Sequence, residues 1–277
     1  MAPKSKNNGD PNLQREIEEV AAIIVKRRHV VAFSGSGVSK ESGIPTFREP
    51  DGLWNRFEAG ASGGIMGVVS AYPDKAPDIL EELLNTFRKA QPNPGHLALV
   101  ELEKLGLLDA VITQNIDNLH REAGNTKVYE LHGNIYRLKC MSCGQKKLRE
   151  RGELLDEFGK LIAEMRRSGI QNIFSLAPHC ECGGVLRPDF VAFGEMVQDL
   201  PEAIEAASRC RVMLILGTSG VVYPAASLPS YARNAGATLV EVNPDRSALT
   251  HLAGYFLQGQ TGAILPELVK EVRRRLK

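Results

Sequence analysis

The chain has 277 residues, of which 43% are hydrophobic and 24% are charged, and its formal net charge is +1. This hydrophobic content excludes a disordered chain and fits one large globular domain with room for a smaller insertion. The near-neutral charge gives no strong nucleic-acid signal, since nucleic-acid-binding domains are usually strongly basic. Residues 1–10 lack the apolar core of a signal peptide, and no apolar run reaches the roughly 20 residues needed to cross a bilayer. We therefore expect a soluble cytoplasmic protein without a membrane segment.

Predicted strands and helices alternate along most of the chain. Asp10 and Pro11 are typical of a helix start, as cap and first-turn residue, and apolar residues then recur at helical spacing. Strands are predicted at 29–33, 111–112, 128–131, 212–216 and 238–242, and helices at 95–104, 224–234 and 264–276. This alternation predicts an α/β fold in which helices cover both faces of a Rossmann-like parallel sheet, with the functional loops at the carboxyl ends of the strands.

Two stretches interrupt this alternation. Residues 54–91 have helical periodicity and little strand signal, and residues 139–184 contain four of the five cysteines. We predict that the first stretch is a helical insert and that the second is a small zinc-binding module. The Rossmann-like domain would then consist of residues 11–53, 92–138 and 185–277.

Four cysteines form two close pairs, Cys140 with Cys143 and Cys180 with Cys182. Two such pairs can close a tetrahedral zinc site, and in a reducing cytosol a metal is a better interpretation than disulfides. Four thiolates fill the coordination shell, so the metal would hold the module together and do no chemistry. Unrelated thiols are the alternative. We expect His179 to be a non-ligand and Cys210 to be a small buried residue.

A glycine-rich loop follows the first predicted strand, with the sequence Gly35-Ser36-Gly37-Val38-Ser39. Its glycines would let the backbone approach a pyrophosphate closely. The third glycine of a GxGxxG motif is replaced by Lys40, so an ordinary glycine-rich turn is the alternative. Two further polar loops raise the specificity, because Gly217-Thr218-Ser219-Gly220 follows the strand at 212–216 and Asn243 ends the strand at 238–242. Together the three loops predict one extended nucleotide groove.

Taken in order, these motifs resemble the sirtuin family from about Val30 to Pro266. The shared pieces are the glycine loop, Ser-Gly-Ile-Pro-Thr-Phe-Arg at 42–48, Thr-Gln-Asn-Ile-Asp at 113–117, Leu-His-Gly at 131–133, the two cysteine pairs, Phe-Gly-Glu at 193–195, Gly-Thr-Ser at 217–219 and Val-Asn at 242–243. The details are most similar to the bacterial and mitochondrial branch that includes desuccinylases. That similarity rests on 45–48, on Gly-Leu-Trp at 52–54 and on Val-Val-Tyr-Pro-Ala-Ala at 221–226.

The resemblance implies an NAD-dependent protein-lysine deacylase with two bound groups, NAD and one structural zinc ion. Its partner would be the acylated lysine of a protein substrate. The residues implied in NAD binding are Gly35, Ser36, Gly37, Val38, Ser39, Ile44, Thr46, Phe47, Arg48, Trp54, Gln114, Asn115, Ile116, Asp117, Gly217, Thr218, Ser219, Asn243, Pro244, Asp245 and Thr261. The substrate peptide would pair as an added strand with Val191, Phe193, Gly194 and Glu195.

The resemblance also implies a mechanism in which His132 is the general base. The amide oxygen of the acyl-lysine would attack the ribose carbon that bears nicotinamide, and nicotinamide would leave. His132 would then act on the ribose hydroxyls, and the products would be lysine and O-acyl-ADP-ribose. A histidine suits this role because its pKa lies near neutral pH. For His120, which follows the Gln-Asn-Ile-Asp segment, we expect structural support.

Some positions depart from the family pattern. Ser36 stands where many sirtuins have Ala, and Thr46 stands where deacetylase-type members often have Asp. Desuccinylase-type members carry a Tyr-x-x-Arg pair that binds the acyl carboxylate, and the segment 72–91 has none. That segment instead contains Leu80, Leu83, Leu84 and Phe87. We therefore expect an apolar acyl pocket and activity on neutral acyl groups.

Two other functions compete with deacylation at this point. The first is mono-ADP-ribosyl transfer, which uses the same NAD chemistry with a protein nucleophile in place of the acyl oxygen. The second is a zinc-ribbon binding module that holds NAD without turnover. The presence of both the candidate base and the Gln-Asn-Ile-Asp segment argues against the second.

Overall fold

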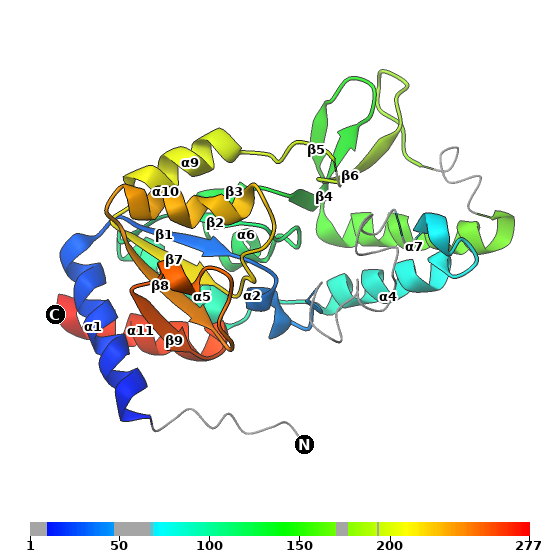
Figure 1. The fold of residues 1–277 in the computed structure, drawn as a ribbon. Coiled ribbons are helices and arrows are strands. Elements are labelled where there is room, and N and C mark those ends of the chain that lie inside the picture. Colours follow the sequence, from blue (N-terminus) through cyan, green and yellow to red (C-terminus); the bar gives the residue numbers. More distant parts are fainter. Residues whose placement is uncertain (1–9, 47–66, 68, 170–176, 193) are drawn as a thin grey trace.

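The fold is seen in a computed structural model that describes residues 10–46, 67, 69–169, 177–192 and 194–277 (Figure 1). The large domain contains a six-stranded sheet of parallel strands in the order β3-β2-β1-β7-β8-β9. The strands are β1 (Val30–Ser34), β2 (Leu108–Thr113), β3 (Val128–Glu130), β7 (Val212–Leu216), β8 (Thr238–Asn243) and β9 (Tyr255–Gln258). This order reverses between β1 and β7, and ligands of such sheets bind at the carboxyl ends of the strands near the reversal.

Helices cover both faces of this sheet, as Figure 1 shows. One face carries α1 (Pro11–Arg27), α5 (Pro94–Lys104) and α11 (Thr261–Leu276), and the other carries α9 (Leu200–Arg209) and α10 (Leu228–Asn234). Side chains of β1 alternate between the two faces: Val30 and Ala32 pack with α1 and α11, while Val31 and Phe33 pack with α9 and α10. Burial on both faces explains why this strand is a continuous apolar run. Short elements complete the domain: α2 (Gly37–Lys40), α6 (Leu119–Ala123), η2 (Ala225–Ser227) and η3 (Thr250–Leu252).

A second body, which we call the small module, lies beside the large sheet (Figure 1). It contains the antiparallel sheet β5-β4-β6, formed by β4 (Gly133–Cys140), β5 (Lys146–Leu148) and β6 (Leu186–Phe190). Its helices are α7 (Arg151–Ser168) and α4 (Ala76–Lys89), which pack against each other. Its core joins Tyr136, Leu138, Leu154 and Leu155 with Leu84 and Phe87 of α4. The described part of the helical insert therefore belongs to the same body as the cysteines.

The predicted α/β class is confirmed, and the bounds of β1, β3, β7 and β8 lie within one residue of those predicted, while β2 begins three residues before the predicted strand. Asp10 caps α1 as predicted, because its carboxylate accepts a hydrogen bond from the Asn12 N–H at 2.9 Å. The helix predicted at 224–234 is divided into the short η2 turn and α10, which begins at Leu228 and has Pro229 in its first turn, where the missing N–H of proline costs no helical bond. Elements β9, α7 and α9 were not predicted from the sequence. The sheet of the small module also extends beyond 139–184, from Gly133 to Phe190.

Among the described residues, no helix combines the length and the apolar character that a bilayer crossing requires.

The chain enters the small module through a close backbone contact at Gly133. This residue has a φ of +82°, and a Cβ atom on it would lie 1.9 Å from the Asp189 carbonyl oxygen. Both facts require glycine, because a side chain would strain the backbone and collide with β6. The contact sets the spacing between β4 and β6 beside His132.

We predict that Gly133→Ala destabilises the protein more than Gly236→Ala, a matched control. Gly236 has a φ of +86°, but a Cβ atom added there would meet nothing within 4 Å. Its alanine variant should therefore lose stability only through backbone strain, about 1–2 kcal/mol. The collision at Gly133 should add roughly 1–3 kcal/mol. Urea unfolding of the two variants measures the difference, and equal losses would contradict the structural role of the contact.

Candidate active site

The loops after β1 and β7 touch each other at the reversal of the strand order. The Gly37 N–H donates to the Gly217 carbonyl at 2.8 Å. A Cβ atom on Gly37 would lie 2.7 Å from that oxygen, and a Cβ atom on Gly35 would lie 2.8 Å from Cβ of Thr218. From the sequence, these glycines are expected to allow the close approach of a ligand. The structure adds a second reason, because the two loops pack backbone to backbone only if side chains are absent.

Ser39, Asn115 and Asp117 form a buried hydrogen-bonded cluster beneath the β1 loop. The Ser39 hydroxyl donates to Oδ2 of Asp117 at 2.6 Å, and Nδ2 of Asn115 donates to the Ser39 hydroxyl at 3.0 Å and to the Gly35 carbonyl at 3.1 Å. The Leu119 N–H donates to Oδ1 of Asp117 at 3.0 Å. Burial raises the pKa of Asp117, while the bonds from Ser39 and Leu119 lower it. The cluster holds polar groups from two loops in fixed directions.

One small pocket opens on this cluster. It is lined by Ser36, Ser39, Ile44, Asn115, Ile116, Asp117 and Phe87. All of these except Phe87 were predicted to bind the cofactor, and the fold brings them together from the loops after β1 and β2. Phe87, which was predicted to line the acyl pocket, reaches this pocket from α4. Its half-buried ring also packs on the core of the small module.

His132 lies at the passage from β3 to β4, beside these loops. Its Nδ1 is 2.9 Å from the Gln114 carbonyl oxygen. Because a carbonyl can only accept, Nδ1 carries the proton, and the neutral ring has its lone pair on Nε2. Burial lowers the pKa of His132, and the hydrogen bond to Gln114 opposes this shift. The imidazole is therefore held with a fixed tautomer.

Residues from the β7 and β8 loops are linked to the same region through Thr218. Nε2 of Gln114 donates to the Thr218 hydroxyl at 3.1 Å. Nδ2 of Asn243 donates to the Thr218 carbonyl at 2.9 Å and to Glu241 at 3.2 Å. Both amide hydrogens of Asn243 are engaged, so Oδ1 remains as an acceptor for the hydroxyls of a ligand. The three predicted loops thus form one continuous edge of the sheet.

Thr261 begins α11, and its hydroxyl is buried without a hydrogen-bond partner among the described residues. Buried polar atoms in proteins almost always have a partner, so this hydroxyl fits the approach of a polar ligand or a water molecule. The observation agrees with the predicted place of Thr261 in a nucleotide site.

The remaining predicted residues have varied surroundings. Phe47, Arg48, Trp54 and Phe193 lie outside the described residues, while Thr46 and Val38 are buried and Ser219 and Asp245 are exposed. The Pro244 carbonyl accepts a hydrogen bond from Gln258 at 3.0 Å.

The predicted substrate segment has its own local contacts. The Val191 N–H donates to the His132 carbonyl at 2.9 Å. The Glu195 side chain pairs with Arg187 and accepts from the Ala192 N–H at 3.1 Å, while Gly194 is exposed. The carboxylate of Glu195 therefore stabilises a local turn, and the Glu195 N–H closes the same turn by donating to the Ala192 carbonyl at 3.0 Å.

His120 has the structural surroundings that were expected. Its Nε2 lies 2.9 Å from the Ser34 hydroxyl, which in turn donates to the Thr113 hydroxyl at 2.9 Å. The ring contacts His96, with the centroids 4.8 Å apart. Burial lowers the pKa of both rings, that of His96 to about 4, so they remain neutral at pH 7. This buried row supports the carboxyl ends of β1 and β2.

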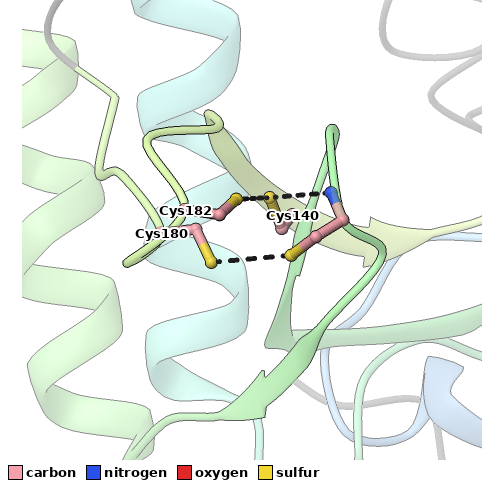
Figure 2. A group of neighbouring side chains, drawn as sticks. Cys140, Cys180 and Cys182 are labelled. Atoms are coloured by element: carbon pink, nitrogen blue, oxygen red, sulfur yellow. Dashed lines mark hydrogen bonds between the residues drawn. The ribbon is translucent and has the colours of Figure 1, made fainter.

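The four paired cysteines meet at the far end of the small module, as Figure 2 shows for Cys140, Cys180 and Cys182. All four sulfur atoms lie within 4.8 Å of one another, with 3.5 Å from Cys140 to Cys182 and 3.8 Å from Cys143 to Cys180. A tetrahedral zinc ion with Zn–S bonds of about 2.3 Å would place its sulfur ligands about 3.8 Å apart. The donor set and its dimensions therefore fit one structural zinc ion.

Backbone amides favour the thiolate form of Cys140. The nitrogen atoms of Cys143 and Ser142 each lie 3.4 Å from the Cys140 sulfur, and their N–H groups lower the pKa of Cys140 to about 6, while the bonds to Cys140 and Cys182 raise the pKa of the Cys143 thiol. By contrast, Cys210 is buried on its own in the large domain, and burial raises its pKa to about 12. Position therefore separates the four clustered thiols from the fifth cysteine, which lies apart from them in the large domain.

We predict that Cys143→Ser lowers the zinc content well below one ion per chain, because an incomplete thiolate set binds zinc weakly. Cys210→Ala is the matched control and should retain the full zinc content. Elemental analysis of the purified variants measures the ratio, and thermal unfolding should show a loss of stability for Cys143→Ser. Full zinc retention by Cys143→Ser would argue against the four-cysteine site.

Comparisons with known proteins agree with this geometry. The model of the Sir2 family matches residues 35–224. An NAD-dependent protein deacylase of Desulfosudis oleivorans is 43% identical over 267 residues, which are 95% of this chain and 98% of the relative. Among solved structures, a mutant Sir2 homologue in complex with ADP-ribose has a TM-score of 0.77 at 38% identity and covers 94% of this chain and 97% of its own.

A second solved structure is a Sir2 protein bound to a myristoylated histone peptide. It has a TM-score of 0.70 at 33% identity and covers 95% of this chain and 98% of its own. The matches extend over both the sheet domain and the small module. The chain belongs to the Sir2 family.

Proposed function

We propose that this protein is an NAD-dependent protein-lysine deacylase with His132 as its general base. One observation carries the proposal: Nδ1 of His132 is held by the Gln114 carbonyl, and Asn115, the residue after Gln114, lines the small pocket together with Asp117. A base with a fixed tautomer beside such a pocket is the arrangement that acid–base chemistry requires. Relatives that cover nearly the whole chain carry the name NAD-dependent protein deacylase, which supports the same function.

The residues present fit NAD as the bound group. Both amide hydrogens of Asn115 are engaged within the cluster, so the pocket offers Oδ1 of Asn115 and the Asp117 carboxylate as acceptors for the NH2 group of a carboxamide. Thr218, Asn243 and Thr261 offer polar atoms farther along the sheet edge. When bound, NAD supplies the ribose carbon that accepts the acyl oxygen, with nicotinamide as the leaving group. The loops after β1 and β7 would hold its two halves and exclude water from the reacting end.

His132 would take a proton from a ribose hydroxyl through Nε2. This step needs the neutral imidazole, and burial favours that form because it lowers the pKa. The hydrogen bond from Nδ1 to Gln114 stabilises the ring after it gains the proton on Nε2. The same bond orients the ring, so the base needs little reorganisation before it acts.

We predict an acidic limb in the pH profile of deacylation with a midpoint below 6.5, the ordinary pKa of histidine. The neutral form of His132 is the active one. The rate should therefore fall as the pH drops through the lowered pKa of His132, and titration of His132 should not change the rate at higher pH. Steady-state rates with an acetyl-lysine peptide and NAD measure the profile. A midpoint above 6.5 would contradict the assigned environment.

His132→Ala should reduce O-acyl-ADP-ribose formation by roughly 10²–10⁴-fold, the usual contribution of a positioned base. His251→Ala, at an exposed histidine, is the control and should have normal activity. Undiminished deacylation by His132→Ala would refute the catalytic assignment. With NAD labelled in its ADP-ribose part, a label fixed on protein would instead indicate mono-ADP-ribosyl transfer.

For the acyl group, we infer a preference for neutral chains. Leu80 and Leu83 on α4 are half-buried, and Leu84 packs on the core of the small module. Arg88 of α4 donates to Asp156 at 2.7 Å and to the Leu155 carbonyl at 3.3 Å. This arginine is therefore already engaged with α7, and α4 offers no Tyr-x-x-Arg pair to a carboxylate. A Sir2 relative is bound to a myristoylated histone peptide, and a myristoyl group is a long neutral acyl chain.

We predict that acetyl and myristoyl peptides of one sequence are deacylated faster than the succinyl peptide, by roughly tenfold or more in kcat/KM. An unpaired carboxylate in an apolar pocket loses its hydration without compensation. Mass spectrometry of the three peptides with NAD measures the rates, and the His132→Ala protein gives the background. Fastest turnover of the succinyl peptide would overturn the preference.

A further inference from the structure

Arg137 on β4 bridges two buried carboxylates, five residues after His132. Its Nε donates to Oδ2 of Asp189 at 2.6 Å, its Nη1 donates to Oε2 of Glu130 at 3.0 Å, and its Nη2 donates to Oε1 of Gln198 at 3.2 Å. The side chains of Glu130 and Asp189 are only 3% and 1% exposed, so these contacts are shielded from solvent. A planar guanidinium is the side chain that can satisfy several acceptors at once in this way.

The partners of Arg137 belong to the segments that frame the His132 backbone. Glu130 is the last residue of β3, two positions before His132. Asp189 lies on β6, two positions before Val191, whose N–H donates to the His132 carbonyl. The Gln198 N–H donates to the Leu131 carbonyl at 2.9 Å. Arg137 thus ties together the backbone before His132 and the two segments that bond to it.

Other cations also contact these carboxylates, but each contacts only one. Lys146 lies 3.1 Å from Asp189, and Arg121 lies 3.2 Å from Glu130. Nδ2 of Asn134 also donates to Glu130 at 2.7 Å. Removal of Arg137 therefore leaves neither carboxylate without a charged partner, and the variant should fold. What is lost is the direct side-chain bridge from Glu130 on β3 to Asp189 on β6, while Nε2 of Gln198 still donates to Asp189 at 2.9 Å.

We propose that Arg137 is a positioning residue that aligns His132 for its role as general base. The proposal rests on the proposed function. The imidazole is held by Gln114 on the large domain, while the His132 carbonyl is held by Val191 beyond the end of β6. Arg137 sets the relative placement of these two supports. A displacement of about 1 Å at such a site can cost about 100-fold in rate.

The test compares two steps of one reaction. Exchange of labelled nicotinamide into NAD, in the presence of an acetyl peptide, reports the departure of nicotinamide before His132 acts. Formation of O-acyl-ADP-ribose reports the step that needs the base. In Arg137→Met, we expect O-acyl-ADP-ribose formation at saturating NAD and peptide to fall by roughly 10–100-fold, and nicotinamide exchange to remain within about twofold of the unmodified protein.

Two further variants make this comparison decisive. Arg137→Lys keeps the charge but cannot bridge all the acceptors, so it should recover only part of the lost rate. If Arg137→Met does not fold, Arg137→Lys carries the same comparison between the two steps. Arg209→Met, at an exposed arginine paired with Glu205, is the control and should resemble the unmodified protein in both assays. Zinc content and thermal unfolding verify that each variant is folded.

Equal losses in exchange and in O-acyl-ADP-ribose formation, or no loss in either, would overturn the positioning role, because a merely structural contact does not distinguish the two steps. A failure of the inference about Arg137 can be distinguished from a failure of the proposed function. If His132→Ala keeps its deacylation rate, the base assignment itself is wrong. If His132→Ala is inactive and Arg137→Met is normal, only the inference about Arg137 is wrong.

Discussion

The backbone passage from Glu130 to Gly133 is the constraint on which the rest of the site depends. Here the chain leaves the large parallel sheet and enters the small module, and Gly133 approaches the Asp189 carbonyl more closely than any side chain would allow. His132 lies within this passage, with its ring bonded to the large domain and its carbonyl bonded to Val191. The placement of the base is therefore a property of the junction between the two bodies.

Burial and hydrogen bonding act in opposite directions on the charged groups near this junction. Burial raises the pKa of Asp117 and lowers that of His132, while hydrogen bonds to the charged forms oppose both shifts. The neutral imidazole and the hydrogen-bonded carboxyl group both follow from burial of these side chains near the junction. The buried His96 and His120 stay neutral and support the carboxyl ends of β1 and β2.

The zinc cluster stabilises the small module far from His132. It closes the end of the small module opposite the junction, where Cys140 ends β4 and the second cysteine pair precedes β6. Strands β4 and β6 are thus joined by the cysteine cluster at one end and by Arg137 with Asp189 near the other. The metal can support the geometry of the base without contact with the reacting groups.

The sequence by itself determined the alternation of strands and helices, the zinc cysteines and the glycine-rich loops, because these depend on local spacing and on residue type. The tertiary structure alone decided which atoms meet. It placed Phe87 beside Asn115 and Asp117, gave Gly35 and Gly37 a contact with Gly217, and brought Arg137 between Glu130 and Asp189. These partners come from separate segments of the chain. Local spacing carries no information about such contacts, since they depend on strand order and on the packing of the two bodies.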